Sequence, residues 1–124
     1  MHERQLLGAT GEELAAKHVT DQGLEVLDRN WRTSVEGVRG ELDLVVRDGE
    51  TVALIEVRTR RSHIAGSAAE SVGSDKRRRL RRLAALYLQS HPHPGPVRGD
   101  VIAVHVPVAV TDPSTSIVHL RGVW

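Results

Sequence analysis

The chain has 124 residues, of which 40% are apolar and 27% charged, with a formal net charge of +1 and no cysteine. This length suits one domain over residues 1–124 that buries a core without covalent staples. The lack of cysteine excludes disulfides, thiolate metal sites and cysteine nucleophiles. No apolar stretch approaches the roughly 20 residues that span a bilayer, and the polar N-terminus is unlike a secretory signal, so we expect a cytoplasmic protein without a membrane partner.

A first helix is expected over residues 6–22, where small and apolar residues recur at i, i+3 and i+4. Thr10 with Glu13 could form a capping box, which would start the helix later. Gly23 is expected to end it. Residues 24–32 follow as a strand, although their apolar alternation is poor.

Two further strands are expected at residues 41–47 and 51–58. They are separated by Asp48-Gly49, a strong hairpin signal. The small and polar residues of segment 59–73 indicate a mobile loop.

Ser74 or Asp75 is expected to open a second helix, whose negative first turn suits the helix dipole. Its core stripe is Leu80, Leu83, Ala84 and Tyr87, and the prolines after His91 stop it. Residues 97–106 read as another strand and residues 117–120 as a short last one. The order α-β-β-β-α-β, with this last strand, predicts an α/β or α+β fold.

The hairpin brings acidic residues onto one face. A two-residue Asp48-Gly49 turn would pair Arg47 with Glu50, Asp43 with Leu54 and Glu41 with Glu56. Because side chains alternate, Glu41, Asp43, Glu56 and Arg58 would share a face, with Asp43 and Glu56 as diagonal neighbours. Such carboxylates can hold Mg²⁺ or Mn²⁺.

Glu56 lies in the most apolar run of the chain, residues 52–57. An ionised carboxylate buried there costs several kcal/mol unless it is paired or metal-bound. The alternative to a metal site is a buried ion pair of Glu56 with Arg58 or Arg39.

The two helices offer further charged groups. Glu12 lies towards the packed side of the first helix, whereas Glu13 would form a solvent-facing ion pair with Lys17. The alternative for Glu12 is a partly exposed carboxylate favoured by the helix dipole. Lys76, one turn before Leu80, could offer its ammonium group to the acidic site or to a phosphate, or it could reach solvent past the core.

The net charge conceals an asymmetry between the two parts of the chain. Residues 1–57 carry a net charge of −6 and residues 58–124 one of +7, and six of the 17 basic residues lie between Lys76 and Arg82. This suits a site that binds metal with one part and phosphates with the other, although the arginines could equally form a solvated helix face. The residues that we expect to bind nucleic acid are Arg60, Arg61, Lys76, Arg77, Arg78 and Arg81.

A series of motifs, in order along nearly the whole chain, resembles the YraN family of small bacterial proteins. The motifs are Gly8-x-x-Gly11-Glu12-x-x-Ala15, Gly23, Arg29-Asn30-Trp31-Arg32, Gly40-Glu41-Leu42-Asp43-Leu44, Ile55-Glu56-Val57-Arg58-Thr59-Arg60, Lys76-x-x-x-Leu80 and Asp100-Val101-Ile102. That family is similar to Holliday-junction resolvases of the restriction-endonuclease-like PD-(D/E)XK superfamily. The resemblance implies an α/β fold with an α-β-β-β-α-β core, in which helices flank a mixed central sheet.

The resemblance also implies a set of metal ligands. Asp43 and Glu56 would be the two acids of the motif and would ligate Mg²⁺ or Mn²⁺ together with the Val57 carbonyl. Glu12 would be the helix-borne acid that completes the cluster. The metal would activate water and stabilise the charge of the phosphoryl transition state.

Arg58 occupies the position of the motif lysine, and the resemblance gives it a catalytic role as the cation that orients the nucleophile. Because arginine stays protonated, it can neutralise phosphate but does not readily act as a base. Asp100 and Lys76 would support the site from the next strand and helix. Leu42 stands where the superfamily pattern has proline.

These features favour a nucleic-acid-binding protein of nuclease fold, a Mg-dependent endonuclease acting on branched or flap DNA. The alternative is a catalytically attenuated nucleic-acid-binding or assembly module, because of Arg58. A third reading is a structural protein whose acidic residues form only an ion-pair network. Resolvase-like folds often act as dimers, and the apolar residues 104–110 could provide a sheet edge for a homodimer.

Overall fold

The computed structural model describes residues 3–61, 72–107 and 115–124, and it describes the backbone alone for residues 3–8 and 61. In chain order the elements of these residues are α1 (Glu3–Asp21), β1 (Glu25–Trp31), β2 (Leu42–Asp48), β3 (Thr51–Arg61), α2 (Ser74–Ser90), β4 (Val97–Val106) and β5 (Ser116–Leu120). The predicted α-β-β-β-α-β order with a short last strand is confirmed.

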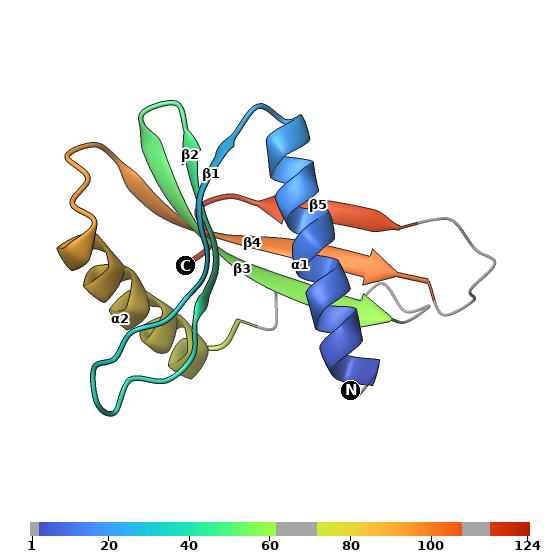
Figure 1. The fold of residues 1–124 in the computed structure, drawn as a ribbon, viewed down its shortest axis with the longest axis horizontal. Coiled ribbons are helices and arrows are strands. Elements are labelled where there is room, and N and C mark those ends of the chain that lie inside the picture. The colour runs from blue at the N-terminus through green and yellow to red at the C-terminus, as the bar shows by residue number, and fades with distance from the viewer. Residues whose placement is uncertain (1–2, 62–71, 108–114) are drawn as a thin grey trace.

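The strands form one five-stranded sheet in the order β1-β2-β3-β4-β5. The pair β3–β4 is parallel and the other neighbouring pairs are antiparallel. A parallel pair needs a crossover connection, and α2 lies on that connection. In Figure 1, α1 crosses in front of β3 and β4, whereas α2 lies to the left, behind the segment that joins β1 and β2.

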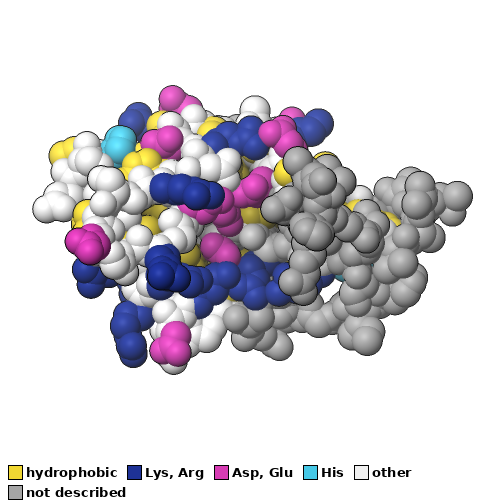
Figure 2. All heavy atoms as spheres, turned by 60° about the horizontal axis from the view of Figure 1, so that its bottom comes forward, with side chains coloured by type: hydrophobic (Ala, Val, Ile, Leu, Met, Phe, Trp, Pro, Cys, Tyr) yellow, Lys and Arg dark blue, Asp and Glu magenta, His cyan; other side chains and the backbone are white. Residues whose placement is uncertain are grey.

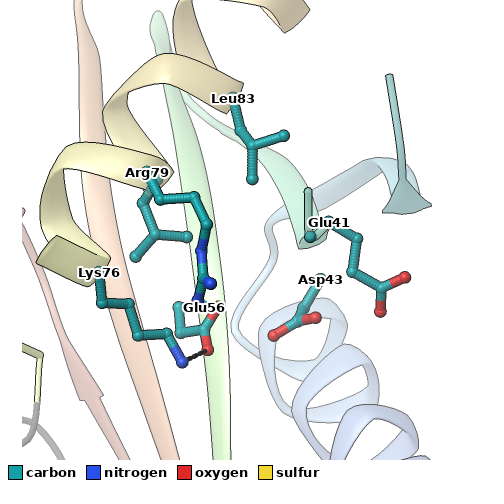
Figure 3. Close-up of a pocket in the computed structure, with 8 residues that line it drawn as sticks. Glu41, Asp43, Glu56, Lys76, Arg79 and Leu83 are labelled. Atoms are coloured by element: carbon teal, nitrogen blue, oxygen red, sulfur yellow. Dashed lines mark ion pairs between the residues drawn. The ribbon is translucent and has the colours of Figure 1, made fainter. Parts of the chain in front are cut away.

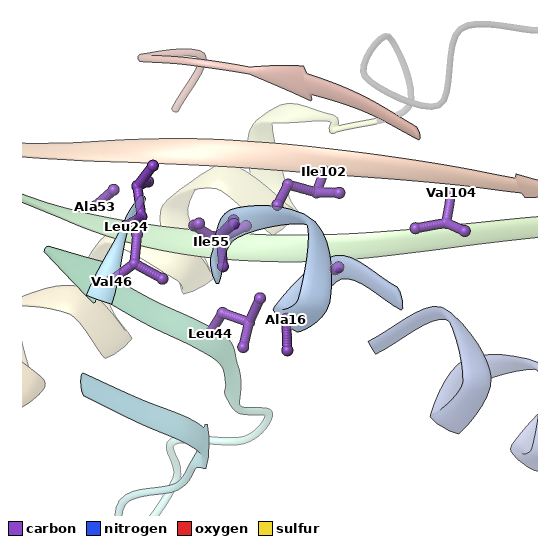
Figure 4. Packing of buried hydrophobic residues seen from close by; sticks show 10 residues of the cluster. Ala16, Leu24, Leu44, Val46, Ala53, Ile55, Ile102 and Val104 are labelled. Atoms are coloured by element: carbon purple, nitrogen blue, oxygen red, sulfur yellow. The ribbon is translucent and has the colours of Figure 1, made fainter. Parts of the chain in front are cut away.

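Helix α1 covers one face of the sheet. Its small residues Ala15 and Ala16 pack with Val19 against buried side chains of β2, β3 and β4 (Figure 4). Val104 belongs to this core and is only 1% exposed. The strand that contains Val104 is paired with β3 on one side and with β5 on the other, so Val104 is not at the free sheet edge that we expected at residues 104–110. Residues 108–110 lie outside the described part of the chain.

Helix α2 covers the opposite face. Its buried residues are Leu80, Leu83, Ala84 and Tyr87, which is the stripe predicted from the sequence. Val45, Val52 and Leu54 lie under this helix, whereas their sequence neighbours Leu44 and Ala53 lie under α1. This alternation confirms the two-sided sheet, with Val45 of β2 and the even-numbered residues of β3 on the α2 side. Leu42, at the start of β2, also packs on the α2 side.

Helix α1 begins at Glu3, earlier than predicted, and ends where predicted. Gly23, at φ +85°, accepts the left-handed conformation that follows a helix. Its N–H donates to the Thr20 carbonyl and the N–H of Leu24 donates to the Val19 carbonyl. These two bonds form a Schellman motif, which turns the chain directly into β1.

The predicted register of the β2–β3 hairpin is wrong by two residues. Asp48 pairs with Thr51 and Arg47 with Val52, so the turn consists of Gly49 and Glu50. Gly49 has φ +62° and occupies the first central position, which suits a type II′ turn, rather than the second position of the turn that we assumed. Because the shift is an even number of residues, each side chain keeps its predicted face.

Two other strands differ from prediction for visible reasons. The ladder between β1 and β2 shifts between Val26 and Asp28, and this bulge explains the poor apolar alternation of β1. Strand β3 continues to Arg61 instead of ending at residue 58, because residues 59–61 pair with β4. The rest of the predicted loop, apart from residues 72–73, lies outside the described residues.

No helix within the described ranges combines the length and the apolar character needed to cross a membrane.

The helix α1 approaches β3 closely at Gly11. A Cβ atom at this position would overlap the Thr59 hydroxyl and would lie 2.8 Å from the Thr59 Cβ. Because Thr59 is branched at Cβ and stiff, the two backbones could not stay this close with a larger residue. Glycine at position 11 thus allows α1 to lie close to β3, and this approach fixes the position of the next helix residue, Glu12.

We expect Gly11→Ala to lower the free energy of unfolding by about 1–3 kcal/mol, the usual cost of overpacking. In an open helix the same substitution would raise stability by roughly 0.5–1 kcal/mol, so the sign of the change is diagnostic. Urea unfolding measures it. The control is the same substitution in a Thr59→Ala background, which removes the hydroxyl and the methyl group closest to that Cβ and should recover part of the loss.

Candidate metal and phosphate site

Three carboxylates from separate parts of the chain meet at the start of β2. Glu12 comes from α1, Glu41 precedes β2, and Asp43 lies inside β2. One carboxylate oxygen of each lies within 4.8 Å of one oxygen of each of the others. The structure therefore brings together two of the predicted acids, Glu12 and Asp43, with a third that we had placed only on the same face.

Asn30 holds two of these carboxylates in place. Its side-chain Nδ2 donates to Glu12 Oε1 at 2.8 Å and to Glu41 Oε1 at 3.0 Å. Asn30 has φ +51°, a conformation that asparagine tolerates better than most residues. Arg32 adds a hydrogen bond from its Nε to Glu41 Oε2 at 2.8 Å. The strand β1, with its bulge, thus provides the outer support of the acidic cluster.

Asp43 is the most perturbed acid of the site. Its side chain accepts a hydrogen bond from the backbone N–H of Val57 at 2.7 Å, across the β2–β3 pair. Burial, followed by the charge of Glu56, raises the pKa of Asp43 to about 8, and Glu12 and Glu41 add to this effect against the Val57 hydrogen bond. A divalent cation would relieve this repulsion.

Glu56 faces the same pocket but is held by a different partner. Its Oε1 lies 2.7 Å from the Nζ of Lys76, and the two side chains are 10% and 28% exposed. Lys76 therefore reaches the acidic site from α2, one of the outcomes that its sequence position allowed. Glu56 is outside the group of three carboxylates that lie close to one another among the described residues.

The pocket has walls of opposite charge. Glu41, Asp43 and Glu56 line it on the sheet side, and Lys76 and Arg79 line it on the α2 side. Figure 3 shows Lys76 and Arg79 extending from the helix, with Glu41 and Asp43 opposite them. Such a pocket can accommodate a cation beside its acids and an anionic group beside its bases.

The arginines of β3 continue the positive charge from the pocket. Arg58 lies on the same face of the strand as Glu56, by alternation, and is partly buried. Burial and the neighbouring charge of Arg60 lower the pKa of Arg58, while Glu56 and Asp43 act in the opposite direction. Arg60 is exposed, and the Arg61 side chain lies outside the described part of the structure.

The outer face of α2 is strongly basic. The exposed residues include Arg77, Arg78 and Arg81, as predicted. Arg78 forms an ion pair with Asp75, but the two groups are exposed and lie 3.8 Å apart. Such a pair contributes little and leaves the charge available to solvent. Figure 2 shows acidic side chains in the middle of one face of the molecule, with Lys and Arg side chains above and below them.

Asp100 does not support this site, contrary to the role implied by the resemblance. By alternation along β4 it lies with Ile102 on the α1 side of the sheet, opposite to Glu56. It is fully buried and accepts hydrogen bonds from Arg98 Nε, from the Gly122 N–H, and from His119 Nε2 at 2.8 Å. Burial pushes the pKa of Asp100 up, but these hydrogen bonds and the Arg98 charge bring it below its usual value.

The expected pair between Glu13 and Lys17 is also replaced. Lys17 pairs with Asp21 at 2.7 Å, and Glu13 pairs with Arg29 at 2.6 Å. Glu13 remains exposed, so it does not join the cluster.

Three contributors to the site were absent from the predicted set of site residues: Glu41, Asn30 and Arg79. Glu41 shares the β2 face with Asp43, a signal that was present in the alternation. Arg79 follows Lys76 by three residues and precedes Leu83 by four, so helical spacing places it on the inner edge of α2. For Asn30 only its left-handed conformation gives a signal, and a sequence does not show it.

We expect Asp43→Asn to stabilise the metal-free protein at neutral and alkaline pH. The folded state keeps the Asp43 proton up to about pH 8, whereas the unfolded chain loses it near pH 3.8, the ordinary pKa of an aspartate. Stability of the wild type therefore falls as pH rises between these values. The asparagine variant lacks this loss.

Urea unfolding in the presence of a chelator, repeated across this pH range, measures the difference. The control is Asp48→Asn in the same strand, which should destabilise, because Asp48 accepts a hydrogen bond from Arg98 at 2.9 Å. An Asp43→Asn protein that is less stable than the wild type at every pH would contradict the expectation.

Known proteins place the chain in a family. Residues 11–104 match the model of the uncharacterised protein family UPF0102. A UPF0102 protein of Frankia casuarinae is 46% identical over 125 aligned residues, which cover 100% of both chains. A UPF0102 protein of Kineococcus radiotolerans is 44% identical, with 97% of this chain and 94% of the relative covered. The match agrees with the YraN-like motifs, and this chain belongs to the UPF0102 family.

Proposed function

We propose that this protein binds nucleic acid and hydrolyses phosphodiester bonds with the aid of Mg²⁺ or Mn²⁺. The observation that carries the proposal is the pocket with opposed charges, in which acidic residues of the sheet face Lys76 and Arg79 of α2. A phosphodiester with a bound divalent cation has the complementary arrangement of charges.

The donor set fits such a cation. Glu12, Glu41 and Asp43 offer only carboxylate oxygens, which Mg²⁺ and Mn²⁺ prefer, and the three can approach a common point. The pKa of Asp43 is raised first by burial and then by the negative charge of Glu56, with smaller effects of Glu12 and Glu41, and a bound cation would offset both the burial and the repulsion. Glu56 and the Val57 carbonyl, which the resemblance adds to the ligands, belong to the adjacent strand β3. When bound, the ion supplies Lewis acidity toward water and phosphate.

The basic side chains would then position the substrate. Arg58, beside Glu56 on the same face, would neutralise charge on the reacting phosphate, because a guanidinium stays protonated. Lys76 and Arg79 would bind phosphate oxygens at the α2 side of the pocket. The exposed arginines of α2, together with Arg60 and Arg61, would hold the flanking backbone.

For the substrate we propose DNA of branched or flap structure, on the strength of the similarity of the YraN-like motifs to resolvases. An arginine-rich helix beside a recessed pocket suits a substrate whose backbone runs over the helix while one strand enters the site. A homodimer, which we expected from the same similarity, would present two such sites.

We expect the wild type to cleave a labelled four-way junction or flap in the presence of Mg²⁺ or Mn²⁺. In Glu12→Gln we expect the cleavage rate to fall by at least about a hundredfold. The matched control is Glu13→Gln, one residue along the same helix, where the carboxylate pairs with Arg29 at the surface. Gel analysis of the products measures both. Equal cleavage by the two variants would contradict the assignment of Glu12.

Arg58 favours a second function, a nucleic-acid-binding or assembly module with attenuated catalysis. The substitution that separates the two functions is Arg58→Lys, which restores the motif lysine. If the wild type binds the junction without cleaving it and Arg58→Lys gains metal-dependent cleavage, the native protein is the attenuated module. Cleavage by the wild type supports the enzyme.

We expect binding to DNA to weaken steeply with salt. On B-DNA each phosphate contact contributes about 0.9 to the slope of log affinity against log salt. Arg77→Ala and Arg81→Ala should each reduce that slope by about this amount, measured by fluorescence anisotropy in a chelating buffer. Arg47→Ala is the control, because Arg47 is exposed near the β2–β3 turn. An affinity that does not depend on salt would favour the hypothesis of a structural protein whose acidic residues form only an ion-pair network.

A further inference from the structure

Lys76 makes a short charge contact inside the pocket. Its ammonium lies 2.7 Å from Glu56 Oε1, and Figure 3 shows this contact on the α2 side of the site. Glu56 is buried, at 8% exposure, so its charge depends strongly on this partner. Lys76 thus supplies to Glu56 the positive charge that a divalent ion would supply.

The same carboxylate cannot serve both cations fully. The ammonium group occupies one oxygen of Glu56, and Glu56 stands apart from the three mutually close acids among the described residues. An ion bound to those acids would attract Glu56 and repel Lys76 across the same small pocket. The two events are therefore coupled by electrostatics.

The position of Lys76 permits its head group to move without a change of backbone. It lies in the first turn of α2, and the helix is anchored one turn later by the buried Leu80. The lysine side chain has a flexible four-carbon stem, and 28% of the side chain is exposed, so it borders solvent on the helix whose outer face carries Arg77 and Arg78. A released ammonium would join the basic surface of the helix.

We propose that Lys76 is an exchangeable counter-ion, which holds Glu56 in the metal-free protein and is displaced when a divalent cation binds the acidic cluster. Once displaced, the ammonium faces the anionic substrate. Metal binding therefore both completes the acidic site and adds one positive charge to the phosphate-binding surface. This inference rests on the proposed function, because it assumes the cation.

The test is a titration of the full chain with Mn²⁺ in the absence of nucleic acid. Electron paramagnetic resonance measures the concentration of free Mn²⁺ at each point. Lys76→Met removes the ammonium and keeps the apolar stem, and we expect a several-fold lower dissociation constant. Arg77→Met removes one positive charge from the exposed neighbouring position. It controls for the general electrostatic effect of removing a positive charge from α2. We expect it to change the dissociation constant much less.

Thermal unfolding gives a second readout. In a chelator, Lys76→Met should melt below the wild type, because Glu56 loses its partner, and saturating Mn²⁺ should abolish or reverse this difference. If Lys76→Met does not fold, Lys76→Gln carries the same expectations and retains a hydrogen-bond donor for Glu56.

The outcomes separate this inference from the proposed function. If none of the proteins binds Mn²⁺, the metal site itself fails. If the wild type binds Mn²⁺ and Lys76→Met binds it no more tightly than Arg77→Met, the exchange is wrong and the proposed function stands. Weaker binding by Lys76→Met would show that the lysine supports the metal site, and it would also overturn the exchange.

Discussion

Negative charge buried between two neighbouring strands is the constraint around which this site is built. Asp43 and Glu56 are 9% and 8% exposed, and each raises the electrostatic cost of the other. The protein meets that cost with the Val57 N–H at Asp43 and with the Lys76 ammonium at Glu56. Placing Lys76 there requires α2 to cross this face of the sheet, and gathering Glu12 requires α1 to approach from the other. The positions of both helices are thus linked to two carboxylates.

Much of the fold could be predicted because its signals are local. The apolar stripe of α2 and the strand that becomes β4 follow from periodicity within one element, and both agree with the structure. The hairpin register failed because it depends on whether Gly49 takes the first or the second central position of the turn, and one glycine in two residues does not decide this. The prediction of the end of β3 was wrong because that end is set by pairing with β4, whose paired residues are 45 positions further along the chain.

The site was predicted less completely, since its members meet through tertiary structure. Glu12 and Asp43 were expected and do meet, whereas the amide of Asn30 enters between Glu12 and Glu41 only because of its left-handed backbone conformation. Asp100 is the opposite case, a residue that was expected at the site and does not lie there. The family resemblance implied that Asp100 supports the site from the next strand, but the parallel register places it opposite Ile55, on the other face. The face of a β residue depends on a register that its own sequence does not contain.

The mixed sheet has a consequence for the order in which the chain assembles. The β2–β3 hairpin can close within microseconds, because its strands are joined by two residues. The β3–β4 pair closes a much longer loop and is slower. Asp43 and Glu56 can therefore approach each other before α2 delivers Lys76. During that interval only the Val57 N–H offsets the repulsion between the two carboxylates, and protons or dissolved cations can screen the remainder, so the folding rate itself becomes sensitive to the ionic medium.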